Sequence, residues 1–153
     1  MRTFKSNPDL GLAVLRVVVG GTFAAHGLQK LLVFGMSGLA AFLAQQGIPF
    51  PYPSALAVTA AELLGGLALA LGFSTRLAAL PLAFSMLVAM LSVHLKGGFF
   101  LPSGVEYTAV LFAASLAFAL VGPGRWSIDG LLSRRRSAQE VDRPALVSDE
   151  IRI

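Results

Sequence analysis

The stretch LGLAVLRVVVGGTFAAHGLQKLLVF, residues 10–34, decides the fold class. A bilayer core about 30 Å thick requires about 20 apolar residues in a helix, and this stretch meets that length. Asn7-Pro8-Asp9 comes just before it and predicts a helix start, because Asn7 can cap free amide groups and Pro8 suits the first helical position. The run is too long for a signal-peptide core and no small-residue cleavage site follows it, so we expect a retained membrane span.

Three more apolar runs follow, and turn-forming residues separate them. Gly47 to Pro53 contains three alternating prolines, which predict an extended loop between the first two spans. Ser103 to Glu106 has the spacing of a capping box and predicts the start of the last span. The sequence therefore predicts an all-α integral membrane four-helix bundle with spans at about 10–34, 54–71, 77–95 and 103–121.

Composition supports the same class. Hydrophobic residues make up 56% of the chain and charged residues 13%, against about 25% charged in an average soluble domain. The absence of cysteine excludes disulfides, thiolate zinc sites and a cysteine nucleophile, so redox chemistry requires a borrowed cofactor. The net charge of +4 lies mostly in one tail, which favours a role in membrane topology over nucleic-acid binding.

The distribution of cations predicts the topology. The predicted loops at 35–53 and 97–104 contain no lysine or arginine, so the positive-inside rule places both termini in the cytoplasm. We expect a cytoplasmic segment at 1–9, a membrane domain at 10–132 and a charged, disordered cytoplasmic tail at 133–153. The cations on the other side of the spans are Arg2, Lys5, Arg76, Arg125, Arg134, Arg135 and Arg136.

Several ionisable side chains lie inside the apolar runs. Each costs about 2.5–3.5 kcal/mol on insertion, so each requires an explanation. At 100° per residue the three on the first span share one helix face, and the predicted topology places all of the candidates except Arg16 in the outer half of the bilayer. We therefore expect a polar cluster between the helices. Its candidate members are His26 and Lys30 on the first span, Glu62 on the second, His94 on the third and Glu106 on the fourth. Arg16, also on the first span, is a candidate that lies closer to the cytoplasmic side.

Structural alternatives exist for each candidate. Lys30 can extend to the membrane surface, Glu106 can close its capping box and His94 can be an interfacial residue. Glu62 lies in the middle of a run with no cap to serve, so its main alternative is an ion pair with His26 or Arg16. His26 and His94 would be a weak haem site, and no pair of histidines has zinc spacing.

Small residues on the first two spans predict a close helix contact near His26 and Glu62. Gly65 and Gly66 follow Glu62 directly. The matching face of the first span carries Gly20, Gly21, Ala24 and Gly27.

Seven motifs follow one another along the chain: Arg16, the run HGLQK at 26–30, ELLGG at 62–66, GFSTR at 72–76, His94, GVE at 104–106 and GPGRWSID at 122–129. In this order they resemble the DoxX/DoxD-like family of small four-helix membrane proteins. The resemblance covers about Leu10 to Leu132 and implies a multi-pass protein of the bacterial or archaeal cytoplasmic (inner) membrane. It also implies redox chemistry, since DoxD-type members form the membrane part of a thiosulfate:quinone oxidoreductase and some DoxX members act with enzymes of thiol and oxidant stress.

From this resemblance we expect the membrane subunit of a quinone-linked redox complex. Glu62 and His26 would be the catalytic groups that exchange protons, and Arg16, Lys30, His94 and Glu106 would bind the substrate. We expect no metal and no covalently bound cofactor, a quinone as ligand, and a soluble redox partner protein besides the lipid bilayer, with homo-oligomerisation open. A non-catalytic membrane scaffold or assembly factor is the alternative, and a carrier for a small solute or a proton comes third.

Overall fold

The computed structural model describes residues 7–141, and these form helices and loops without a β-strand. Three helical segments are long and apolar enough to cross a bilayer, namely Pro8–Gln45, Pro51–Leu71 and Thr75–Gly97. A fourth apolar helix, α6 (Glu106–Val121), is shorter. The described residues confirm the all-α fold, and three of the helical segments have the length and apolarity that a membrane span requires.

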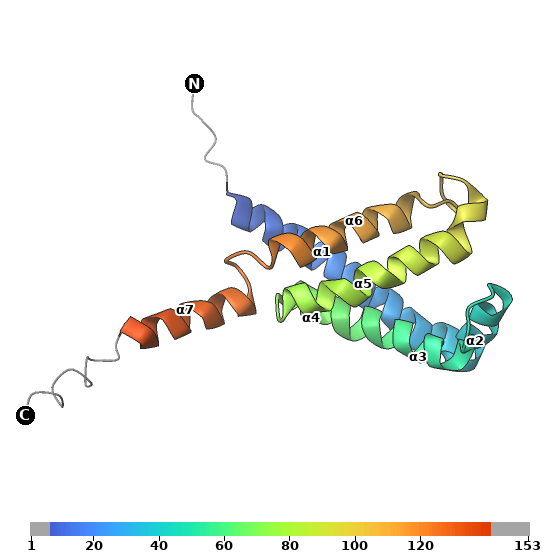
Figure 1. Cartoon of the computed structure of the whole chain (residues 1–153), viewed down its shortest axis with the longest axis horizontal. Coiled ribbons are helices and arrows are strands. Elements are labelled where there is room, and N and C mark those ends of the chain that lie inside the picture. The colour runs from blue at the N-terminus through green and yellow to red at the C-terminus, as the bar shows by residue number, and fades with distance from the viewer. Residues whose placement is uncertain (1–6, 142–153) are drawn as a thin grey trace, which may run out of the picture.

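The first long segment contains a break that the sequence did not reveal. It consists of α1 (Pro8–Gln29), a π-helical turn (Lys30–Phe34) and α2 (Gly35–Gln45). Asn7 caps α1 as predicted, since its side-chain oxygen accepts the backbone N–H of Leu10 at 3.2 Å. We predicted a loop from residue 35, but Gly35 has φ 67° and ψ 158° and only redirects the chain, so α2 continues out of line with α1 (Figure 1).

The second long segment begins inside the predicted loop. It consists of α3 (Pro51–Ala60), a π-helical turn (Ala61–Gly65) and α4 (Gly66–Leu71). The prediction that residues 47–53 are extended throughout was wrong at its end, because Pro51 and Pro53 lie in the first turn of α3. Backbone N–H groups there have no intrahelical partner, so proline loses nothing.

The third segment consists of α5 (Thr75–Ala89), a π-helical turn (Met90–His94) and a 3₁₀ turn (Leu95–Gly97). After it, α6 begins at Glu106 and not at residue 103, and the predicted capping box does not form. The Glu106 carboxylate instead accepts the backbone N–H of Leu101 at 2.8 Å, which holds the preceding loop.

The predicted disordered tail is helical where the structure describes it. Helix α7 (Ile128–Val141) projects beyond the other helices (Figure 1). Its start is capped by Ser127, whose hydroxyl accepts the backbone N–H of Gly130 at 3.0 Å. Residues 1–6 and 142–153 lie outside the described part of the chain.

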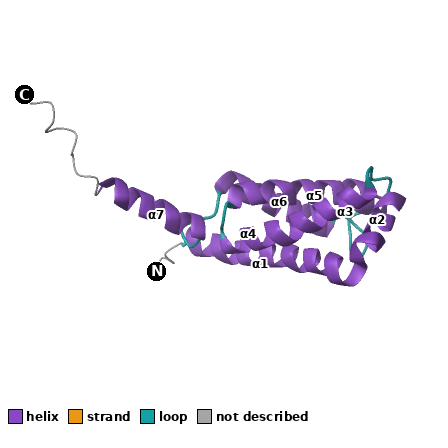
Figure 2. Cartoon of the chain, turned by 90° about the horizontal axis from the view of Figure 1, so that it is seen from below, coloured by secondary structure: helices purple, strands orange, loops and turns teal. Residues whose placement is uncertain are grey.

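Helices α1, α4, α5 and α6 lie side by side (Figure 2). Their shared core contains Phe23, Leu69, Leu82, Met86 and Phe118. The outward faces of the same helices are also apolar, which is the pattern of helices solvated by lipid and not by water. Large exposed side chains on these faces include Val18, Leu67, Leu77, Phe84, Val110 and Leu120.

The contact between the first two long segments depends on glycine. A Cβ atom placed on Gly20, Gly27 or Gly66 would lie 2.5 Å from a backbone nitrogen of the opposite helix, so no side chain fits at these positions. The predicted close approach is therefore present at these three residues. Gly21 faces open space and Gly65 has room for a Cβ, so these two glycines do not contribute to it.

Substitution of the two adjacent glycines on α1 tests this contact. Gly20→Ala forces the helix backbones apart and should lower the free energy of unfolding by about 1–3 kcal/mol, the usual cost of overpacking. Gly21→Ala is the matched control and should be neutral or stabilising by up to about 1 kcal/mol, because alanine favours helix. Thermal unfolding in mild detergent measures both, and equal effects of the two variants would contradict the close approach.

Candidate functional site

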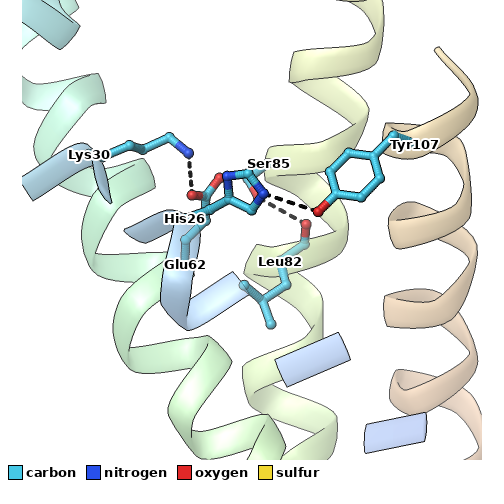
Figure 3. A network of polar contacts seen from close by, with 6 residues as sticks. All are labelled: His26, Lys30, Glu62, Leu82, Ser85 and Tyr107. Carbon is cyan, nitrogen blue, oxygen red and sulfur yellow. Dashed lines mark hydrogen bonds and ion pairs between the residues drawn. The ribbon is translucent and has the colours of Figure 1, made fainter. Parts of the chain in front are cut away.

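The most deeply buried charge in the candidate site is Glu62. Its side chain is 2% exposed and forms an ion pair with the ammonium group of Lys30, which is 19% exposed. The two side chains point toward each other across the contact between α1 and the second long segment (Figure 3). The bulk of the ion pair is shielded from lipid, as the insertion cost of a charge requires.

Three of the candidate residues lie in π-helical turns. Lys30 begins the first such turn, Glu62 is the second residue of the next, and His94 ends the third. A π-helical turn inserts an extra residue into a helix and thereby rotates the side chains around it, and such turns are frequent at functional sites. The helices are thus locally distorted where they carry polar groups.

His26 forms a second polar contact next to this ion pair. Its Nε2 lies 3.0 Å from the hydroxyl oxygen of Tyr107 on α6, and the two rings are 5.9 Å apart between centroids (Figure 3). His26 is half-buried and Tyr107 is 37% exposed, so this contact reaches the side of the bundle. The sequence analysis missed Tyr107, and the one available signal was a phenol directly after Glu106 at the predicted helix start.

The structure brings Lys30 and Glu62 together with His26 beside them, but places Arg16, His94 and Glu106 elsewhere. The Nδ1 atom of His94 donates to the backbone carbonyl of Ser103 at 3.1 Å, and Glu106 holds the same loop through Leu101. Both side chains therefore serve the connection between α5 and α6. No group of three or more His, Cys, Asp or Glu side chains that could hold a metal ion occurs among residues 7–137, whose side chains are described.

Arg16 lies at the far end of α1, about 21 Å from Lys30 along the helix axis at 1.5 Å per residue. It is 3% exposed and its guanidinium donates to three backbone carbonyls. The acceptors are Ala70 at the end of α4 (3.3 Å), and Pro123 (2.5 Å) and Trp126 (2.6 Å) between α6 and α7. Arg16 thus joins three parts of the chain at one end of the molecule, away from Glu62.

The family model described as DoxX matches residues 11–95. A Bacillus subtilis protein named "Putative oxidoreductase CatD" is 31% identical, over 79% of this chain and 86% of that protein. The chain belongs to the DoxX family. The inner membrane protein YqjF of Escherichia coli is 33% identical, over 86% of this chain and 98% of that protein. An uncharacterized membrane protein of Mycobacterium tuberculosis is 34% identical, over 81% of this chain and 82% of that protein, and no solved structure matches significantly.

In this DoxX protein the motifs at 72–76 and 122–129 meet at the Arg16 end of the molecule. The Asp129 carboxylate accepts the backbone N–H groups of Ser74 (2.8 Å) and Thr75 (3.0 Å), and so caps the start of α5. The Asp129 N–H donates to the Gly72 carbonyl at 2.9 Å. A side chain on Gly72 would clash with the Arg16 guanidinium, and Gly72 also has φ 71°, so glycine is required there twice over.

Replacement of Arg16 should destabilise this DoxX protein. Arg16→Gln removes three charge-assisted hydrogen bonds from partly buried carbonyls and should lower the free energy of unfolding by about 1.5–3 kcal/mol. Arg76→Gln removes the same charge from an exposed site at the same end and should change it by less than about 0.5 kcal/mol. Denaturant titration in mixed micelles measures both, and an Arg16 variant as stable as the Arg76 variant would refute a structural role.

Proposed function

We propose that this DoxX protein is the membrane subunit of a quinone-linked redox complex acting in thiol, sulfur or oxidant-stress metabolism. The observation that carries the proposal is the pairing of two contacts, the buried Lys30–Glu62 ion pair and the His26–Tyr107 hydrogen bond next to it. Ionisable groups in a membrane interior are rare and mark proton or substrate sites. The B. subtilis relative CatD is named as an oxidoreductase, which also supports oxidoreductase chemistry.

The proposed topology has four spans with both termini in the cytoplasm of a bacterial or archaeal cell. Helix α6 is 16 residues long, or about 24 Å, but it packs along α5, and the loop that precedes it adds apolar length. Arg76, Arg125 and Arg134 all lie at the same end of the helix bundle, the end that contains Arg16. The positive-inside rule assigns this end to the cytoplasm. The inner membrane location of the E. coli relative YqjF is consistent with this placement.

The side chains of the site fit a quinone head group as a substrate. A quinone carbonyl accepts hydrogen bonds, and the Tyr107 hydroxyl, the His26 ring and the Lys30 ammonium group are all donors. Tyr107 and His26 reach the side of the bundle, so a lipid-soluble ligand can approach them without entering water. Reduction of a quinone to a quinol takes up two electrons and two protons.

Within this proposal the chain supplies and positions protons. Tyr107 and His26 lie where a proton can pass to a ligand oxygen, and Glu62 provides a negative charge that stabilises a cationic Lys30 nearby. With no cysteine in the sequence, the electrons come from a thiol or sulfur substrate through a soluble partner protein.

A non-catalytic scaffold is the second candidate. It is favoured by the number of polar side chains that are occupied in structural contacts, since Arg16, His94 and Glu106 all bind backbone groups. In a scaffold the Lys30–Glu62 pair would fix the register of the helices and nothing more.

Two tyrosine variants separate these candidates. Tyr107→Phe removes one hydroxyl and keeps the ring, so the redox proposal predicts at least about 100-fold slower quinone reduction, the usual scale of a lost acid–base group. Tyr52→Phe, at an exposed position on α3, is the matched control and should retain full activity. Membranes from a host strain that lacks its own copy and produces each variant are assayed with a short-chain ubiquinone and with thiosulfate or a thiol as donor.

The amount of each variant in the membrane is measured by immunoblot, so that activity is compared at equal protein level. Full activity of Tyr107→Phe, or equal quinone reduction by membranes without the chain, would contradict the redox proposal. A loss of activity that follows only a loss of protein would support the scaffold.

A further inference from the structure

The end of the molecule opposite the Lys30–Glu62 pair carries a groove with a different chemistry. It has a volume of about 700 Å³, within the range of small-molecule sites, and lies between the start of α1, the end of α4 and the first turns of α7. Two arginines, Arg125 and Arg134, line it. None of the six candidate residues for the redox site belongs to it.

The groove combines these cations with an exposed apolar floor. Leu71 is 58% exposed, Leu131 57% and Trp126 65%, and all three line the groove together with Ile128. In water such a floor would be unfavourable, whereas cations beside exposed leucine and tryptophan are typical of protein surfaces at the level of lipid headgroups. A small free anion could bind the arginines, but it would leave the apolar floor without a contact.

One carboxylate also lines the groove, and it does not cancel the positive charge. Asp9 accepts the backbone N–H of Arg125 at 2.9 Å through Oδ1. With Asp9, Arg125 and Arg134 ionised, the lining carries a net charge of +1. Asn7 adds an amide at the rim, although its oxygen is already used in capping α1.

The walls of the groove are held in place by hydrogen bonds. Asp129, in the first turn of α7, binds the start of α5 through Ser74 and Thr75, and its N–H donates to Gly72. Arg16 holds the carbonyl of Trp126. The start of α7 is therefore fixed against the bundle, and the two arginines face a preformed concave surface.

We propose that this groove binds the phosphate headgroup of one anionic phospholipid, with Arg125 and Arg134 on the phosphate and the apolar floor against the glycerol and upper acyl region. Basic pockets beside membrane helices on the cytoplasmic side bind such headgroups, and each arginine contributes about 1 kcal/mol near an anionic surface. The lipid would join α7 to the membrane-spanning helices. This inference does not depend on the proposed redox function.

Single arginine variants of the full chain test the proposal. Binding of a fluorescent phosphatidylglycerol to the protein in neutral detergent should weaken about five-fold in Arg125→Gln and in Arg134→Gln, equivalent to about 1 kcal/mol each. Arg135→Gln removes the same charge from α7 but does not line the groove, and should change affinity by less than about two-fold. Circular dichroism verifies the fold, and Arg134 lies exposed on α7, so at least that variant is expected to fold.

Two competition experiments and one comparison of variants decide the outcome. Phosphatidylcholine should not displace the fluorescent lipid, and inorganic phosphate should displace it only weakly because it cannot contact the floor. Equal losses in Arg134→Gln and Arg135→Gln would show unspecific attraction to a basic helix and overturn the proposal. Binding of phosphatidylcholine as tight as that of phosphatidylglycerol would overturn it as well. So would complete displacement of the fluorescent lipid by inorganic phosphate.

Discussion

The burial of the Glu62 carboxylate is the constraint on which the arrangement of the first two spans depends. A charge with 2% exposure among apolar helices has to be paired, and its partner Lys30 lies on the other helix. The pair forms only if the two helices approach closely. Gly20, Gly27 and Gly66 permit that approach, so the packing of the helices and the polar site are one structural feature.

The polar side chains of this DoxX protein divide into three groups with different tasks. Lys30 and Glu62 lie in π-helical turns and His26 contacts Tyr107 beside them, and the proposed function assigns proton exchange to this group. His94 and Glu106 hold the loop before α6. At the other end, Arg16 and Asp129 join the loops that carry α5 and α7, and the groove lined by Arg125 and Arg134 lies beside them.

The sequence predicted features that depend on local chemistry. Asn7 and Pro8 mark the start of α1, glycines on two helices mark a close contact, and Glu62 in an apolar run marks a buried polar group. The features that it did not predict depend on tertiary geometry. Gly35 redirects the chain without ending the helix, Pro51 is tolerated in a first turn, and Tyr107 has a role only because α6 brings it to His26.

The role of Arg16 also depends on tertiary geometry that the sequence does not specify. Arg16 shares a helix face with His26 and Lys30 and was expected to bind substrate with them, although the predicted depth already placed it closer to the cytoplasmic side. Three carbonyls from loops distant in sequence determine its role, and no pattern in the sequence specifies where loop carbonyls point.

The contact between Lys30 and Glu62 can be observed directly in a bilayer. Solid-state NMR on protein with ¹⁵N-labelled lysine and ¹³C-labelled glutamate should show a cross peak between a lysine Nζ and a glutamate Cδ, and this peak should vanish in Glu62→Gln. A spectrum without the cross peak, or a peak that persists in Glu62→Gln, would contradict the ion pair and with it the proposed site.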